Sequence, residues 1–123
     1  MKQRALVAVV DDDESVRESL PDALSRIGFA VRAFASAQEF LASDCIAGTQ
    51  CLILDINMPG MSGPELQREL IHRGRAIPTI FITAQSQDSI PPSLLEKGAV
   101  KVLFKPFSKA ELQAALDAAL TRV

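Results

Sequence analysis

The stretch QCLILDINMPGMSGPE, residues 50–65, decides the fold class of this chain. Four mostly apolar residues at 51–54 run directly into a carboxylate, Asp55, and a loop rich in Pro and Gly follows at once. A short apolar run that is continuous rather than alternating is typical of a strand covered on both faces. The stretch therefore predicts a buried strand that delivers an acid to one edge of a sheet.

Short apolar runs of this kind recur along the chain, at residues 5–10, 30–34, 51–54, 78–82 and 100–104. Amphipathic stretches separate them, and a Ser three residues before a Glu marks helix starts in the manner of a capping box, at Ser36 and Glu39, Ser62 and Glu65, and Ser108 and Glu111. Alternating strands and helices imply a parallel sheet with helices on both faces, and right-handed crossovers leave few topologies. The sequence predicts an α/β fold, a single flavodoxin-like doubly wound sheet of five parallel strands in the order 2-1-3-4-5 with five helices, over residues 1–123.

The fourth of the expected helices is constrained by Pro91 and Pro92. Adjacent prolines cannot occupy a helix interior, because each lacks a donor and clashes with the preceding turn. We therefore expect this helix to begin near Ser89, with the prolines in its first turn, or to be short. A long, mobile loop is expected before it.

Composition excludes several classes of function. The net charge is -2, from 15 acidic residues against 13 Lys and Arg, so no strongly basic surface for nucleic acid is expected. The first apolar run is short and stops at an acidic triplet, which argues against a signal peptide or membrane span and predicts a cytoplasmic protein. The cysteines, Cys45 and Cys51, match no metal-ligand spacing and are expected to be reduced thiols.

Carboxylates end two strands that are neighbours in the predicted order. Asp11 and Asp12 follow the first strand and Asp55 ends the third, at strands about 4.8 Å apart. Like charges this close repel each other unless one takes up a proton or a cation intervenes. A cluster made only of oxygen ligands suits a hard divalent ion, and we expect Mg²⁺.

The fourth and fifth strands end in Thr83 and Lys105, so four strand ends converge on one edge of the sheet. A carboxylate flanked by a metal, a hydroxyl donor and an ammonium is arranged to attack phosphorus, with Asp55 as the nucleophile. Phosphoryl transfer requires mainly positioning and charge stabilisation. Each residue alone also has a structural interpretation, as a helix cap, turn residue, strand end or solvated lysine. Asp13 can cap the first helix while Asp11 and Asp12 bind the metal.

Over its whole length the chain resembles a bacterial two-component response-regulator receiver domain. VVDDDESVRESL resembles the acidic end of that family's first strand, and LILDINMPGMSGPEL resembles its phospho-acceptor segment. PTIFITA supplies the Thr and VLFKPF supplies the Lys-Pro pair. The amino-acid sequence of these segments most resembles that of FixJ-type receivers.

The resemblance implies a signalling phospho-acceptor that promotes its own aspartyl phosphorylation and dephosphorylation, rather than an enzyme. It implies phosphorylation of Asp55 by a sensor histidine kinase, and contacts from Thr83 and Lys105 to the phosphoryl group. It implies Mg²⁺ held by Asp11, Asp12, Asp55 and the backbone carbonyl of Asn57. It further implies a cis Lys105–Pro106 bond and an output face on the fourth helix, fifth strand and fifth helix. That face would regulate an output domain, a partner or a phosphorylation-dependent homodimer.

The sequence departs from the family's pattern at two places. The family usually has Tyr or Phe three residues before the Lys, where this chain has Val102, and the double proline falls in the helix that usually rearranges. One hypothesis is an order–disorder change of residues 85–92 on phosphorylation.

Two other functions stay open. The first is an interaction module of the same fold that acts without phosphorylation. The second is a haloacid-dehalogenase-like phosphatase that uses Asp11 of a D-x-D motif as its nucleophile. Mg²⁺ affinity, phosphodonor labelling and replacement of Asp55 by Asn separate these alternatives. The sequence names neither the kinase, the signal, the lifetime of the phosphoryl group nor the oligomeric state, and composition does not decide between a stand-alone receiver and one fused to a DNA-binding output domain.

Overall fold

The computed structural model describes residues 5–90 and 99–120, and residues 1–4, 91–98 and 121–123 lie outside the described part. Its strands form one parallel sheet in the order β2-β1-β3-β4-β5. The strands are β1 (Leu6–Val10), β2 (Ala30–Phe34), β3 (Thr49–Asp55), β4 (Thr79–Thr83) and β5 (Ala99–Phe104). The predicted sheet and its order are confirmed, and every predicted strand overlaps an observed one.

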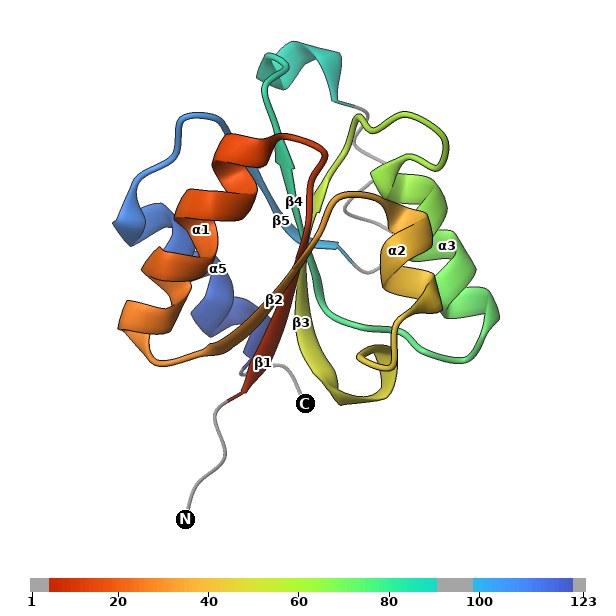
Figure 1. Cartoon of the computed structure of the whole chain (residues 1–123). Coiled ribbons are helices and arrows are strands. Elements are labelled where there is room, and N and C mark those ends of the chain that lie inside the picture. Colours follow the sequence, from red (N-terminus) through yellow and green to blue (C-terminus); the bar gives the residue numbers. More distant parts are fainter. Residues whose placement is uncertain (1–4, 91–98, 121–123) are drawn as a thin grey trace.

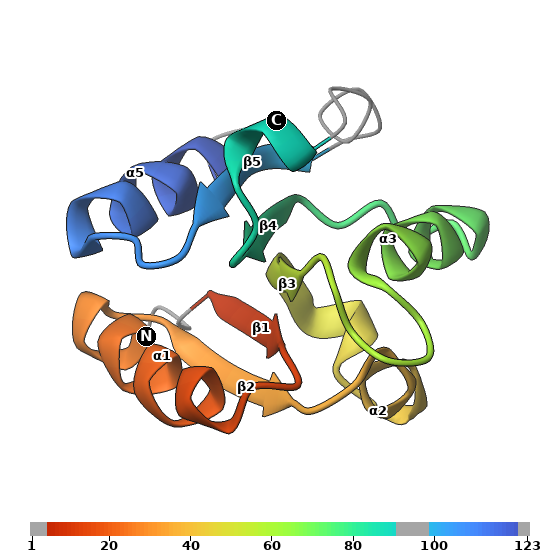
Figure 2. The same ribbon diagram turned by 90° about the horizontal axis from the view of Figure 1, so that it is seen from above.

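Helices cover both faces of the sheet, with α1 and α5 on one side and α2 and α3 on the other (Figure 1). Figure 2 shows the same two layers from above. The helices are α1 (Glu14–Ile27), α2 (Ala37–Ala42), α3 (Gly63–His72) and α5 (Lys109–Leu120), and the 3-10 turns are η1 (Ile46–Gly48) and η2 (Gln87–Ser89). The described residues thus hold four α-helices. The expected fourth helix, with Pro91 and Pro92, lies outside them, and Ser89 is the last residue of η2.

The predicted capping pattern accounts for three helix starts. At α3, the Ser62 hydroxyl accepts from the Glu65 N–H at 3.3 Å, and the Glu65 carboxylate accepts from the Ser62 N–H at 3.0 Å. Ser108 and Glu111 form the same reciprocal pair at α5. At α2 the Ser36 hydroxyl accepts from the Glu39 N–H, but the Glu39 carboxylate reaches one residue further back, to the Ala35 N–H.

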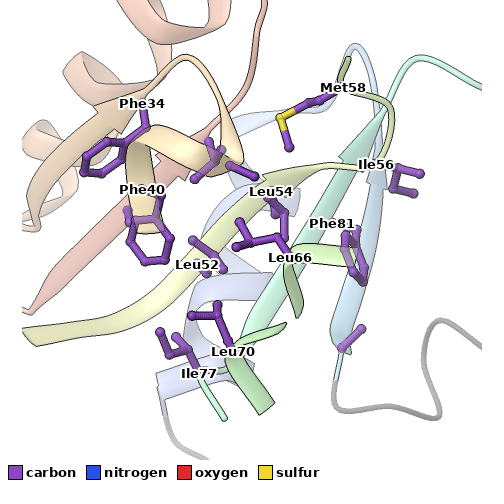
Figure 3. Close-up of a cluster of buried hydrophobic side chains, with 14 of the residues drawn as sticks. Phe34, Phe40, Leu52, Leu54, Ile56, Met58, Leu66, Leu70, Ile77 and Phe81 are labelled. Atoms are coloured by element: carbon purple, nitrogen blue, oxygen red, sulfur yellow. The ribbon is translucent and has the colours of Figure 1, made fainter. Parts of the chain in front are cut away.

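Apolar side chains fill the space on both sides of the sheet. Along β3, Leu52 and Leu54 pack under α2 and α3, whereas Cys51 and Ile53 pack under α1 and α5. This burial on both faces is the reason for the continuous apolar runs in the sequence. Figure 3 shows the cluster on the α2 and α3 side, which includes Phe34 and Phe40. These two rings pack edge to face, and their centroids are 5.3 Å apart.

The cysteines lie in these two clusters, on opposite sides of the sheet. Cys45 and Cys51 are both buried and free, as expected from the sequence. Burial raises the pKa of the Cys51 thiol to about 12, so this side chain is a neutral part of the core.

In the part of the chain that the structure describes, no helix combines the length and the apolar character needed to cross a bilayer.

Candidate functional site

Parallel pairing brings the carboxyl ends of four strands to one edge of the sheet. Val10 pairs with Leu54, Asp55 with Ile82, and Thr83 with Phe104. The residues that end or follow these strands are therefore neighbours across the edge. They are the residues singled out in the sequence, Asp11, Asp12, Asp55, Thr83 and Lys105.

Three carboxylates gather at this edge. One oxygen from each of Asp11, Asp12 and Asp55 lies within 4.8 Å of the others. Asp11 is fully buried and Asp55 is only 6% exposed, whereas Asp12 faces solvent. The cluster therefore opens to water on the Asp12 side and is closed on the side of the sheet.

The surroundings of Asp55 oppose its ionisation. Burial is the largest cause, followed by the neighbouring Asp11, and together they raise the pKa of Asp55 from 3.8 to about 7. Lys105 and the Asn57 N–H, which donates to Asp55 Oδ1 at 3.3 Å, act in the opposite direction. A second acid nearby favours the protonated form of a carboxyl group, and a bound cation would stabilise the ionised form. The donor set consists of carboxylate oxygens, and it fits a hard ion such as Mg²⁺.

Lys105 forms an ion pair with Asp11 and also acts on Asp55. Its Nζ donates to Asp11 Oδ2 at 3.0 Å, and its charge also favours the ionised form of Asp55, the acid that the sequence predicted it to approach. The physical reason is the complete burial of Asp11, because a buried charge is strongly destabilising without a partner. The Lys105–Pro106 peptide bond is cis, as expected.

Asp13 caps α1 and does not join the cluster. Its Oδ1 accepts from the Ser15 N–H at 2.9 Å and from the Ser15 hydroxyl at 2.8 Å. These hydrogen bonds lower the pKa of Asp13. The run of three acids is therefore divided as the sequence suggested, with the first two in the cluster and the third at the helix start.

The Thr83 hydroxyl is buried at the end of β4. Its oxygen accepts from the Gln85 N–H at 3.0 Å, and the Thr83 carbonyl accepts from the Lys105 N–H at 2.8 Å. A hydroxyl that accepts one bond still has a proton to donate. Thr83 thus couples the ends of β4 and β5 and keeps a donor at the edge where the acids lie.

Two residues of the site were not found from the sequence. Arg17 donates from Nη1 to the Asp11 carbonyl at 3.0 Å. Gly63 packs so closely that a Cβ atom there would overlap the Asp55 carbonyl and lie 3.1 Å from the Ile56 Cα. An Arg on an amphipathic helix and a Gly at a helix start have no spacing that distinguishes them, so only the folded arrangement reveals them.

A groove of about 450 Å³ lies beside the cluster, between α1 and the segment that leads from β5 into α5. Val16 and Leu20 of α1 and Phe107 from the other wall give it an apolar lining, and Asp13 and Lys105 also line it. An apolar surface is therefore available next to the acids.

The fold and the cluster together define a class, that of flavodoxin-like α/β domains with an acidic pocket at the ends of β1 and β3. Residues 7–117 match the response regulator receiver domain family, and the chain belongs to this family of two-component signalling proteins. Its likeness to FixJ-type receivers is also confirmed.

Its relatives are regulators. The chain is 42% identical to Nodulation protein W of Bradyrhizobium diazoefficiens over 97% of its own length and 52% of that protein. It is 40% identical to the response regulator protein TodT of Pseudomonas putida, over 98% of the chain and 53% of that protein. It is 38% identical to the transcriptional regulatory protein FixJ of Azorhizobium caulinodans, over 99% of the chain and 58% of that protein. The chain spans about half the length of these curated relatives.

Solved structures agree with this assignment. The response regulator StyR superposes with a TM-score of 0.88 at 41% identity, over 96% of this chain and 60% of that one. FixJ-N superposes with a TM-score of 0.86 at 35% identity, over 99% of this chain and 98% of that one.

Proposed function

We propose that this chain accepts a phosphoryl group on Asp55 from a phosphohistidine of a sensor histidine kinase, in the presence of Mg²⁺. The observation that carries the proposal is the position of Asp55, buried at the end of β3 within an oxygen cluster that includes Asp11 and Asp12. Residues 1–123 form one receiver domain in this proposal, which the family match over 7–117 supports.

Mg²⁺ is held in this proposal by Asp11, Asp12, Asp55 and the backbone carbonyl of Asn57. When bound, the ion neutralises charge on the phosphoryl oxygens and leaves positions for them, because Mg²⁺ keeps exchangeable ligands. A bound cation would favour the ionised form of Asp55, because its charge would offset the burial and the neighbouring Asp11 that raise the pKa of this carboxyl. The ionised Asp55 carboxylate would then be the nucleophile.

The transfer step uses one carboxylate oxygen of Asp55, which attacks the phosphorus of the phosphohistidine. An O–P bond forms while the P–N bond breaks, and the electron pair of that bond stays on the imidazole nitrogen. Thr83 donates its hydroxyl proton to one phosphoryl oxygen. Lys105 turns its ammonium from Asp11 to another, which a flexible side chain permits. Dephosphorylation reverses the state when water attacks the phosphorus and releases phosphate and the free carboxylate.

The partners follow from the same chemistry. The apolar groove beside Lys105 offers the kinase a surface next to the nucleophile. The face that includes β5 and α5 passes the change to an output domain, a partner or a second copy of the chain. In this proposal the chain acts in the cytoplasm, where histidine kinases present their phosphorylated domains.

The test is intact mass spectrometry after incubation with Mg²⁺ and a small acyl phosphate. We expect one added phosphoryl group on the wild-type chain and none on Asp55→Asn, which keeps the shape of the side chain but lacks a nucleophilic oxygen anion. Wild-type protein that stays unmodified at saturating Mg²⁺ would contradict the proposal. Retained modification of the Asn variant would instead point to Asp11 as the nucleophile.

A second candidate is an interaction module that works without phosphorylation. The observation that favours it is Val102, which is half-buried on β5 and packs against the cluster under α2 and α3. An aliphatic side chain at this position lacks the aromatic ring that the family couples to the Thr. The same mass experiment separates the two candidates, because this module would show neither labelling nor Mg²⁺ binding.

A further inference from the structure

All four polar atoms of Asp11 are engaged in hydrogen bonds. Its N–H donates to the Phe34 carbonyl at 3.1 Å, and its two carboxylate oxygens accept from the Asp13 N–H at 2.9 Å and from Lys105 Nζ at 3.0 Å. Its carbonyl accepts from Arg17 Nη1 at 3.0 Å. The first three partners belong to the sheet, the helix cap and the acid site. Arg17 is the partner whose purpose the proposed function does not explain.

We propose that Arg17 is a positioning residue of the cation site, which fixes the peptide between Asp11 and Asp12 and thereby sets the direction of their carboxylates. This inference rests on the proposed function, in which those two acids hold Mg²⁺. Arg17 acts through the main chain and makes no contact with the phosphoryl group.

The geometry of the peptide explains how one hydrogen bond reaches both acids. The carbonyl of Asp11 and the nitrogen of Asp12 belong to the same rigid plane, so a donor that holds the oxygen also orients the start of Asp12. The Asp11 side chain is already restrained by Lys105 and the Asp13 N–H, whereas Asp12 is exposed. The hydrogen bond from Arg17 therefore matters most for Asp12.

Arg17 is suited to this task by its place on α1. The Arg17 N–H donates to the Asp13 carbonyl at 3.2 Å in the first turn of the helix, so its backbone is fixed relative to the β1–α1 corner. A cation near a helix N-terminus is unfavourable with respect to the helix dipole, so helix stability alone does not account for it. The Arg17 side chain instead extends from the helix back to the Asp11 carbonyl, which directly follows β1.

The charge of Arg17 has the opposite effect from its hydrogen bond. A positive charge beside an acid cluster repels a divalent cation, so an Arg that acted only through its charge would weaken Mg²⁺ binding. Its removal would then tighten binding. A positioning role predicts the reverse, because the loss of the hydrogen bond lets the Asp11–Asp12 peptide turn away. The direction of the change in affinity therefore decides between the two roles.

The experiment measures the dissociation constant of Mg²⁺ by calorimetry for the wild-type chain, Arg17→Met and Arg17→Lys. We expect Arg17→Met to bind about tenfold more weakly, as is usual when a group that orients a metal ligand is lost. Arg17→Lys should bind more tightly than Arg17→Met because it keeps a donor. Arg26→Met is the matched control, because Arg26 pairs with Asp22 in the last turn of the same helix. It should bind Mg²⁺ like the wild type.

Two further readouts separate positioning from a loss of folding. The far-UV circular dichroism of each variant should match the wild type at the temperature of the titration. The rate of phosphorylation by a small acyl phosphate should fall at low Mg²⁺ and recover at saturating Mg²⁺, because Arg17 does not contact Asp55. If folded Arg17→Met binds Mg²⁺ as tightly as the wild type or more tightly, or if Arg17→Lys binds it no more tightly than Arg17→Met, the inference is wrong. If the wild type itself binds no Mg²⁺, the proposed function has failed.

Discussion

At the scale of single residues, Asp55 combines two demands that conflict. In the proposed function its carboxylate must be ionised to act as a nucleophile, yet Asp55 is 6% exposed and lies beside a second acid. Burial without a compensating charge stabilises the neutral acid and raises its pKa to about 7. The residue is therefore held near the point at which a cation or a change of pH determines whether it is charged.

The raised pKa of Asp55 predicts how stability depends on pH. Between the unfolded value of 3.8 and about 7, the folded state binds more protons than the unfolded state, so the free energy of unfolding falls as pH rises. Below this window both states are protonated, and above it both are ionised. Each tenfold difference in proton affinity corresponds to about 1.4 kcal/mol. Urea denaturation in EDTA should show Asp55→Asn gaining at least this much on the wild type across the window. Parallel curves would contradict the assignment.

Gly63 restricts the backbone that carries Asp55. Its N–H donates to the Ile56 carbonyl at 3.0 Å, and an added Cβ would overlap the carbonyl of Asp55. We expect Gly63→Ala to lower the free energy of unfolding by about 1–3 kcal/mol, the usual effect of overpacking. Phosphorylation by a small donor should also slow, because the strand end must shift.

Gly48→Ala is the control for this prediction. A Cβ at Gly48 meets only the Leu6 side chain, at 3.9 Å, which is an ordinary contact. Both variants make the same chemical change, so urea denaturation compares them directly. Equal stability of the two variants would show that the close approach of Gly63 is relieved without effect on Asp55.

At the scale of elements, the sequence predicted the features that have a repeating or local pattern, namely the strands and the helix caps. It did not predict a feature that depends on a single long-range contact. The five apolar runs gave strands because burial on both faces requires continuous apolar residues, and that requirement is visible locally. The capping pairs at Ser62 and Ser108 were predictable because both partners lie within one helical turn. The ion pair of Lys105 with Asp11 was not predicted. The Lys105 side chain pairs with an acid on a strand three positions away in the sheet, and this acid is fully buried. The burial of Asp11 depends on the folded arrangement and cannot be read from the local sequence.

The end of β4 offers a prediction about the segment that follows it. The Gln85 N–H donates to the Thr83 hydroxyl, and a hydrogen bond of this kind contributes about 1 kcal/mol. Thr83→Val keeps the shape of the side chain and removes the acceptor, so amide hydrogen exchange at Gln85 should quicken by roughly fivefold. Thr83→Ser retains the hydroxyl and should exchange like the wild type. Unchanged exchange in Thr83→Val would mean that the hydroxyl does not hold this segment.

At the scale of the whole molecule, the order of the strands connects the site to the stability of the fold. β1 and β3 are neighbours inside the sheet, and the acids at their ends come from segments more than 40 residues apart in the chain. The alternation of elements made this neighbourhood predictable, because few topologies satisfy right-handed crossovers. Arg17 and Gly63 were not predictable, because their contacts depend on how the first turns of α1 and α3 lie against the ends of β1 and β3.

An ion held between the ends of β1 and β3 should stabilise the whole domain. Its ligands come from two central strands, so the site cannot open without disturbing the sheet that carries both clusters of apolar side chains. A ligand that binds only the folded state adds about 2.7 kcal/mol at a hundredfold excess over its dissociation constant. We therefore expect saturating Mg²⁺ to raise the free energy of unfolding of the wild-type chain by this amount, measured by urea denaturation.

Amide hydrogen exchange distinguishes this global effect from a local one. We expect the slowest amides of β1 and β3 to exchange through global unfolding, as core strands do, so Mg²⁺ should slow them by the same free energy that urea denaturation gives. Asp12→Asn provides the matched variant, because it changes the exposed acid of the cluster and leaves the buried core intact. Its stabilisation by Mg²⁺ should be much smaller than that of the wild type, while sodium chloride at equal ionic strength affects both chains alike. If Mg²⁺ protects only the loops around Asp12 and leaves the strands unchanged, the ion binds at the surface and does not connect β1 with β3.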